Sequence, residues 1–194
     1  MKLILASSSP RRKRILEEIG LDFSVEKAEI DEISGESPRE IVLANSRSKA
    51  EVVAEKFQNG IVIGADTVVS CRGEILGKPE DRDHARDMIE LQIGNKSYIH
   101  TGLHLIDVES RKAVHGCEVS AVITKNEGSL ESYLDSGLWR GKAGGFGIQD
   151  DGSLQVEILW GEFDNVVGLP GKLLLRLLDM MGFRYPDKTP SMPE

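Results

Sequence analysis

The sequence predicts an α/β protein whose strands form a mixed β-sheet. Helical and extended patterns alternate along the 194 residues, which is typical of this class. The run Ile61–Val69 is nearly all apolar and β-branched, as expected for a central strand covered on both faces. The length suits one domain, so we expect a single α/β domain at residues 1–183 and a loose tail at residues 184–194.

The first elements are short and well delimited. An apolar stretch after Lys2 predicts a buried strand. Pro10 suits the first position of a helix, the serines before it offer an N-cap, and Gly20 marks its end. Alternating polarity at residues 22–26 then indicates a half-exposed strand, which leads into an acidic loop.

The later elements are bounded by proline, glycine and asparagine signals. In chain order, we expect a helix from Pro38 to about Gln58, the central strand, a hairpin at residues 70–76 turning at Arg72-Gly73, a helix at 80–91, strands near 97–107 and 113–124, a short helix at 128–136, a glycine-rich loop at 137–152, a strand at 154–159 and a helix from 173 to about 181.

Composition narrows the range of partners. The formal net charge of −8 and the pI near 5.1 argue against non-specific binding to nucleic acid or to an anionic membrane. Two distant cysteines, Cys71 and Cys117, fit a reducing compartment better than a disulfide framework or a zinc site. The N-terminal apolar run is too short for a signal peptide, and no stretch approaches a membrane span. We therefore expect a cytoplasmic protein.

Four consecutive cations, Arg11 to Arg14, occupy the first turn of the first expected helix. A helix N-terminus carries partial positive charge and normally favours acidic residues. Serine hydroxyls, free backbone N–H groups and guanidinium groups at one place would bind an anion, and phosphate is the natural ligand. The alternative is a solvated basic face on a surface helix.

Asp66 interrupts the apolar central strand. A carboxylate there loses hydration worth several kcal/mol unless a cation or donor replaces the water. It is either a structural acid or a metal ligand or general base at a cleft. Gly64, two residues earlier, fits the close approach of a ligand. Thr67 points to the opposite face on strict alternation.

Two lysines also stand out. Lys49 lies seven residues after Val42 and four before Val53, which places it on the apolar face of its helix. It either extends its ammonium outward to solvent or reaches a phosphate in a cleft. Lys78 follows Gly77 but is not part of a Walker A sequence, and it can still serve as a point charge for phosphate.

Taken in order, these residues resemble the Maf family of nucleoside triphosphate pyrophosphatases. The matching segments are Leu5–Arg12, Asp31-Glu32, Lys49-Ala50, Gly64–Val69, Leu76–Pro79, Thr101-Gly102, Lys142–Gly144, Gly147–Gln149 and Asn165–Pro170. The resemblance covers nearly the whole chain. It implies an elongated mixed β-sheet flanked by helices with a central cleft (Maf/ITPase-like), commonly in a homodimer.

The resemblance also implies an activity: metal-dependent hydrolysis of a nucleoside triphosphate to the monophosphate and pyrophosphate. Arg12 and Asp66-Thr67 are similar to the branch that acts on dTTP and UTP. By the same matching, the implied catalytic residues are Asp66 as proton acceptor, Glu32, Lys49 and Lys78, and the implied substrate-binding residues are Ser7, Arg11, Arg12, Thr67 and Gln149. Glu32 and Asp66 would hold Mg²⁺ or Mn²⁺.

Two other functions are compatible with parts of the sequence. The family is associated with septum formation, so a nucleotide-binding regulator without significant hydrolysis is the main alternative. An RNA-binding domain is disfavoured, because aromatic residues make up only 5% of the chain and no stacking motif is visible.

The chain departs from the family pattern next to Gln149, where Asp150 stands in place of a usual glycine.

Overall fold

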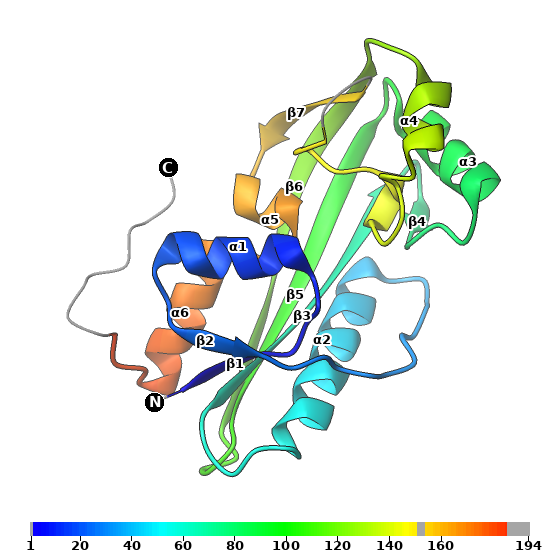
Figure 1. Ribbon diagram of the computed structural model, residues 1–194. Helices are drawn as coiled ribbons and strands as arrows, with labels where there is room; N and C mark the ends of the chain where they lie inside the picture. Colours follow the sequence, from blue (N-terminus) through cyan, green and yellow to red (C-terminus); the bar gives the residue numbers. More distant parts are fainter. Residues whose placement is uncertain (1, 151–153, 186–194) are drawn as a thin grey trace. The chain divides into compact units, whose positions relative to one another are not determined.

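The structure is a computed structural model that describes residues 2–150 and 154–185. Its described strands form a seven-stranded sheet in the order β2-β1-β3-β5-β6-β7, with β4 paired to β3 (Figure 1). The strands are β1 (Leu3–Leu5), β2 (Phe23–Val25), β3 (Ile61–Cys71), β4 (Glu74–Leu76), β5 (Lys96–Asp107), β6 (Ala113–Asn126) and β7 (Leu154–Trp160). β1 pairs in parallel with β2 and β3, whereas β3–β4 and β6–β7 are antiparallel, so the sheet is mixed.

The helices alternate with strands along the first part of the chain, and the last two follow β7. They are α1 (Pro10–Ile19), α2 (Pro38–Ala54), α3 (Arg82–Gln92), α4 (Leu130–Ser136), α5 (Phe163–Val167), α6 (Gly171–Met181) and a 3₁₀ helix at Ala143–Gly145. The predicted α/β class, with a mixed sheet flanked by helices, is confirmed. None of the described helices combines the length and apolar character that a membrane span requires.

The chain packs as two compact units. The first contains Met1–Asp66, Thr101–Glu118 and Gly168–Glu194, and the second contains Thr67–His100 and Val119–Val167. The strands β3, β5 and β6 each contribute residues to both units. The single domain expected over residues 1–183 stays a prediction. Residues 186–194 of the expected tail lie outside the described residues.

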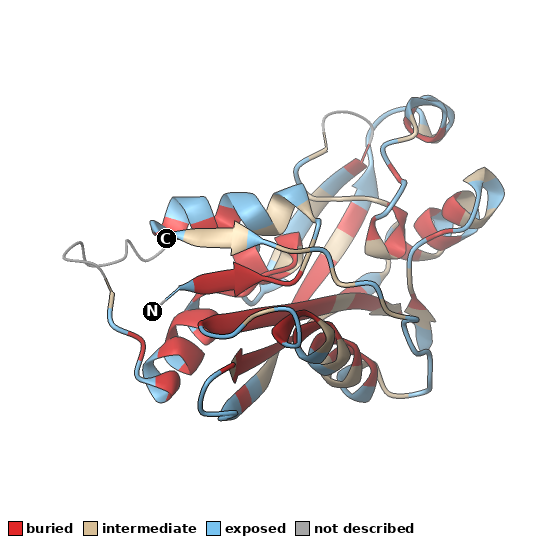
Figure 2. Cartoon of the chain, turned by 60° about the horizontal axis from the view of Figure 1, so that its bottom comes forward, coloured by how far each residue is buried: buried red, intermediate tan, exposed pale blue. Residues whose placement is uncertain are grey.

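In the first unit, α2 packs against one face of the parallel strands. Ile4 of β1 and Val62 of β3 share a buried apolar cluster with Ala50 and Val53 of α2. Figure 2 shows β1 buried along its length, as the apolar stretch after Lys2 predicts. This packing fixes which face of β3 meets α2, and the site described below depends on that register.

Local signals set the starts of both helices of this unit that precede β3. Ser9 caps α1 and Pro10 occupies its first position, while Gly20 ends it in the left-handed region with φ of 83°. Ser37 caps α2, where its Oγ accepts a hydrogen bond from the Glu40 N–H at 3.4 Å. Both N-terminal predictions are confirmed.

The predicted end of α2 is wrong by about one turn. The helix ends at Ala54 rather than near Gln58. Its last turn tightens, because the N–H groups of Lys56 and Phe57 donate to the carbonyls three residues back, those of Val53 and Ala54. The Phe57 ring then packs against the cluster under α2, so a tertiary contact overrides the local signal.

The second unit contains the hairpin and an unexpected helix. Arg72 and Gly73 both have positive φ, 52° and 88°, as a two-residue hairpin turn requires. This confirms the turn predicted there. The helix α5 was not predicted. It is held by the buried side chain of Asn165, whose amide donates to the Ile99 carbonyl and the Ser120 hydroxyl.

Candidate active site

Asp66 lies on the face of β3 that meets α2. Side chains alternate along a strand, so Asp66 shares the face of Val62, which packs on this helix. Gly64 lies between them. A Cβ atom at Gly64 would stand 2.1 Å from the main-chain oxygen of Ser46 and 2.9 Å from the Cβ of Ala50. The close approach expected at Gly64 is therefore made by α2 and not by a ligand.

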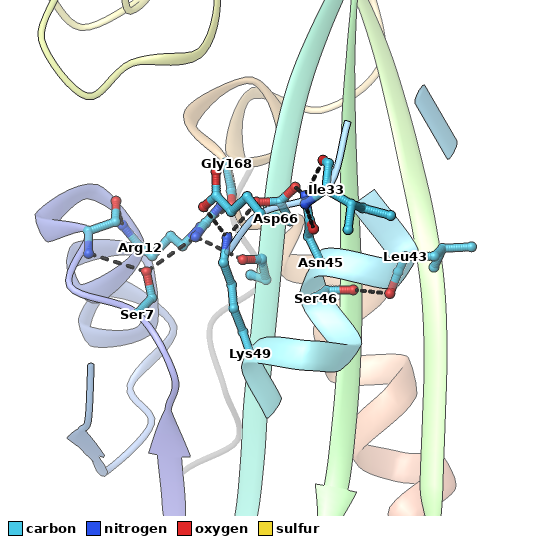
Figure 3. Close-up of polar contacts among 12 residues, drawn as sticks. Ser7, Arg12, Ile33, Leu43, Asn45, Ser46, Lys49, Asp66 and Gly168 are labelled. Carbon is cyan, nitrogen blue, oxygen red and sulfur yellow. Dashed lines mark hydrogen bonds and ion pairs between the residues drawn. The ribbon is translucent and has the colours of Figure 1, made fainter. Parts of the chain in front are cut away.

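This close packing brings Lys49 of α2 to Asp66 (Figure 3). The ammonium of Lys49 lies 2.5 Å from Asp66 Oδ1 and 2.8 Å from Glu32 Oε1 in the acidic loop. Lys49 is 8% exposed and Asp66 is 4% exposed. The interpretation in which Lys49 extends its ammonium to solvent is wrong, because both carboxylates hold it in the interior.

Asn45 completes this arrangement and was missed in the sequence. Its amide Nδ2 donates to Asp66 Oδ2 at 3.1 Å, and its Oδ1 accepts from the Ile33 N–H at 2.9 Å. Asn45 is buried, three residues after Val42 and four before Lys49, on the same stripe of α2. That spacing is the signal that could have found it. The residue ties the acidic loop to the central strand.

The loop before α1 contributes Ser7, and the first turn of α1 contributes Arg12 (Figure 3). Arg12 Nε donates to the Gly168 carbonyl at 2.8 Å, and its Nη1 donates to the Ala65 carbonyl at 3.0 Å and to Ser7 Oγ at 3.2 Å. Burial lowers the pKa of Arg12, while the charge of Asp66 acts in the opposite direction. Asp66 therefore favours the guanidinium cation of Arg12 against the cost of its burial.

The four cations of α1 divide into two pairs. Arg11 and Arg12 are half-buried. Lys13 and Arg14 are exposed and pair with glutamates one turn later, Glu17 at 3.6 Å and Glu18 at 2.8 Å. The solvated basic face is therefore correct for the second pair alone. In the first pair, Arg12 lies beside Asp66 and the residues that contact it.

Six residues of the first unit thus form one polar group, which we name the Asp66 cluster: Ser7, Arg12, Glu32, Asn45, Lys49 and Asp66. It brings five of the sequence-predicted site residues together. The ammonium of Lys49 and the guanidinium of Arg12 supply positive charge, and the two carboxylates supply proton acceptors. A carboxylate whose two oxygens are oriented in this way is placed to accept a proton from water.

The second unit carries three of the other predicted residues, and Arg11 lies in α1 of the first unit. Thr67 directly follows Asp66 on β3 and is half-buried. Lys78 is exposed after β4, and Gln149 is exposed in a turn after the 3₁₀ helix. The segments of Lys78 and Gln149 are joined, because the Gly144 N–H donates to the Gly77 carbonyl at 2.9 Å.

The two carboxylates of the Asp66 cluster fit a metal ion whose other ligands are water and substrate oxygens. Glu32 and Asp66 both lie within 2.8 Å of one ammonium, so their oxygens converge on a single cation. Among the described residues, no group of three or more His, Cys, Asp or Glu side chains could hold a metal ion. Mg²⁺ suits such a pair, because it commonly takes one or two protein carboxylates and completes its shell with water and substrate phosphates.

The chain is similar to known proteins along nearly its whole length. The profile of the family described as "Maf-like protein" matches residues 2–181. A relative from Clostridioides difficile (strain 630), named dTTP/UTP pyrophosphatase, is 42% identical over an alignment of 185 residues that covers 93% of this chain and 94% of that protein. A relative of the same name from Pyrococcus abyssi is 42% identical, covering 94% of this chain and 97% of its own.

A third relative, from Carboxydothermus hydrogenoformans, carries the same name and is 39% identical over 94% of this chain and 100% of its own length. The match of the family profile spans almost every described element, from β1 to the end of α6. On this evidence, the chain belongs to the Maf family.

Proposed function

We propose that this protein hydrolyses dTTP and UTP to the nucleoside monophosphate and pyrophosphate. The observation that carries the proposal is the Asp66 cluster, in which a buried carboxylate lies against the ammonium of Lys49 and beside the guanidinium of Arg12. The relatives named dTTP/UTP pyrophosphatase support the substrate and the bond that is cleaved.

In the proposed reaction, water attacks the α-phosphorus. A new oxygen–phosphorus bond forms, the bond from the α-phosphorus to the bridging oxygen breaks, and pyrophosphate leaves. Asp66 accepts the proton of the attacking water. Asn45 and Lys49 hold the two oxygens of this carboxylate in place, so the acceptor is oriented before the substrate binds.

The remaining roles follow from charge. A triphosphate carries about four negative charges that must be offset before water can attack. We assign this task to Lys49, Lys78, Arg11 and Arg12. Ser7, in the loop before α1, would donate a hydrogen bond to a phosphate oxygen. Thr67 and Gln149 are proposed to contact the nucleoside and so to influence which base is accepted.

A divalent metal, Mg²⁺ or Mn²⁺, belongs to the same proposal. Glu32 and Asp66 would hold it, and it would neutralise phosphate charge when bound. We also propose that the protein is a cytoplasmic homodimer that binds neither nucleic acid nor membranes. The acidic net charge of −8 and the free thiols of Cys71 and Cys117 support this setting.

The test is product analysis in water labelled with heavy oxygen. With UTP or dTTP and Mg²⁺, we expect pyrophosphate and a monophosphate that carries the label, because the attack is on the α-phosphorus. Label in pyrophosphate would place the attack on the β-phosphorus. Release of UDP and inorganic phosphate, or no turnover of either nucleotide, would overturn the proposal.

A further inference from the structure

Gln149 lies in a turn that is closed by two hydrogen bonds between Asp150 and Gly147. The Asp150 N–H donates to the Gly147 carbonyl at 3.0 Å, and Asp150 Oδ2 accepts from the Gly147 N–H at 2.9 Å. Ile148 and Gln149 lie between these residues, and Gln149 is exposed. One aspartate therefore determines the conformation of the backbone that presents Gln149.

The Asp150 carboxylate is itself held from two sides. Lys142 Nζ donates to Oδ1, and the hydroxyl of Tyr133 donates to Oδ2 at 2.6 Å. The side chains of Lys142 and Asp150 are 10% and 12% exposed, and Tyr133 is buried. A pair of opposite charges so shielded from water is costly to break by removing one partner.

The preceding part of the loop is anchored as well. Gln92 Nε2 of α3 donates to the Gly144 carbonyl at 2.7 Å, and the Gly144 N–H donates to the Gly77 carbonyl. Gly144 has φ of 71°, which favours glycine. The loop is thus fixed on α3 and on the segment of Lys78, and Asp150 extends this fixation to the turn of Gln149.

We propose that Asp150 is a positioning residue that holds Gln149 in place and thereby sets the preference for one nucleobase over another. The inference rests on the proposed function, in which Gln149 contacts the nucleoside. Lys142 and Tyr133 complete the clamp. An exposed glutamine discriminates between bases only when its backbone is fixed, because a mobile amide loses entropy on binding and adapts to several partners.

The test compares Asp150→Asn with Asp135→Asn, the same change at an exposed aspartate of α4. We expect Asp150→Asn to raise KM for UTP about ten- to a hundredfold, with a smaller change in kcat. The ratio of kcat/KM for UTP to that for GTP should fall. Asp135→Asn should leave both unchanged. A purely structural role would lower activity toward every nucleotide in proportion to the folded fraction.

A double substitution isolates the positioning role. In a Gln149→Ala background, Asp150→Asn should have no further effect on the UTP to GTP ratio, because the amide that it positions is gone. An unchanged ratio in folded Asp150→Asn, or independent effects of the two substitutions, would overturn the inference while leaving the proposed function intact.

Calorimetry distinguishes a failure of the proposed function from a failure of the inference about Asp150. If the wild-type protein turns over no nucleotide, the proposed function fails, and the dissociation constants of UTP and GTP still decide the inference. Selective weakening of UTP binding in Asp150→Asn would support it, and equal weakening would overturn it. Binding of neither nucleotide to the wild-type protein would overturn both.

Discussion

Among the single residues of the Asp66 cluster, Lys49 is the one that pairs with both carboxylates. Its ammonium is shared between a buried carboxylate and one whose side chain is 37% exposed, Asp66 and Glu32. Desolvating two charges costs several kcal/mol per ion, and the attraction between them offsets that cost only while both partners are present. Removal of the Lys49 ammonium therefore leaves the buried Asp66 without the cation that contacts it.

We expect Lys49→Met to lower the free energy of unfolding by about 3–5 kcal/mol. Urea denaturation near neutral pH measures this. The control is Lys13→Met, which breaks the exposed pair with Glu17 and should cost less than about 1 kcal/mol. Equal losses in the two variants would show that the Lys49 pairs contribute no more than a surface ion pair.

Asn45→Ala should lower both stability and turnover. The substitution leaves the Ile33 N–H and Asp66 Oδ2 without the partner that Asn45 supplies, which costs about 1–3 kcal/mol. Because the acidic loop and Asp66 are no longer joined by this side chain, kcat should fall as well. Asn59→Ala, at an exposed position after α2, is the control. Wild-type kcat in folded Asn45→Ala would contradict a positioning role.

At the level of elements, the site depends on how closely α2 approaches β3. Gly64 and Gly102 are both positions where a Cβ would meet the α2 backbone, at 2.1 Å from Ser46 O and 2.4 Å from Val42 O. The helix can supply Asn45 and Lys49 to Asp66 only at this separation.

Gly64→Ala should therefore destabilise the protein by about 1–3 kcal/mol or more, and it should reduce activity because α2 must shift. Thermal unfolding and a turnover assay check both effects. Gly77→Ala is the matched control, since its Cβ would meet no atom within 4 Å. A Gly64→Ala protein with wild-type stability would show that the helix can move away at little cost.

The strands β5 and β6 carry a stacked histidine pair, His104 and His115, with ring centroids 5.6 Å apart. Burial lowers the pKa of His104, and His115 lowers it further. The unfolded chain then takes up a proton near pH 6.5, whereas the folded chain does so only at lower pH. The contribution of His104 to the free energy of unfolding is therefore fully present above its pKa in the unfolded chain. This contribution decreases as the pH falls through that pKa and below it.

We expect His104→Phe to reduce the loss of unfolding free energy between about pH 7.5 and pH 5.5. Urea titrations at several pH values give this slope for both proteins. His84→Gln, in α3, serves as the control for removing a histidine elsewhere in the chain. An unchanged slope in His104→Phe would mean that this imidazole does not contribute to the pH dependence.

Sequence patterns identify functional residues when their type does not fit the local pattern of apolar positions. Asp66 interrupts an apolar strand and Lys49 an apolar helix face, so each is visible without a structure. Asn45 occupies the same helix stripe, but an amide is a weaker anomaly there than a charge. The roles of α5 and Asp150 rest on contacts with residues far along the chain, such as Asn165 with Ile99 and Asp150 with Tyr133. No local pattern encodes such contacts.

For the whole molecule, the contrast between net charge and local charge matters most. The chain carries a formal charge of −8, yet Arg12 and Lys49 lie together in the Asp66 cluster. Under the proposed function, these local cations would attract the triphosphate against the repulsion from the net charge of the chain. The triphosphate, rather than the nucleoside, should supply most of the binding free energy.

We expect UTP with Mg²⁺ to raise Tm, and uridine to have little effect at the same concentration. Ligand that binds only the folded state at a hundred times its Kd stabilises by about 2.7 kcal/mol. Differential scanning fluorimetry with UTP, UMP and uridine gives the order. An equal shift from uridine would place the binding free energy in the nucleoside and contradict a phosphate-binding role for the cations.

The central claim is that Asp66 accepts the proton of the attacking water. Pyrophosphate release from UTP by Asp66→Asn, measured beside UTP binding, tests it most directly. We predict that turnover falls about a hundredfold or more while the folded variant still binds UTP. Turnover at the wild-type rate in Asp66→Asn would contradict the account, and so would a wild-type protein that binds UTP and never releases pyrophosphate, as a nucleotide-binding regulator would.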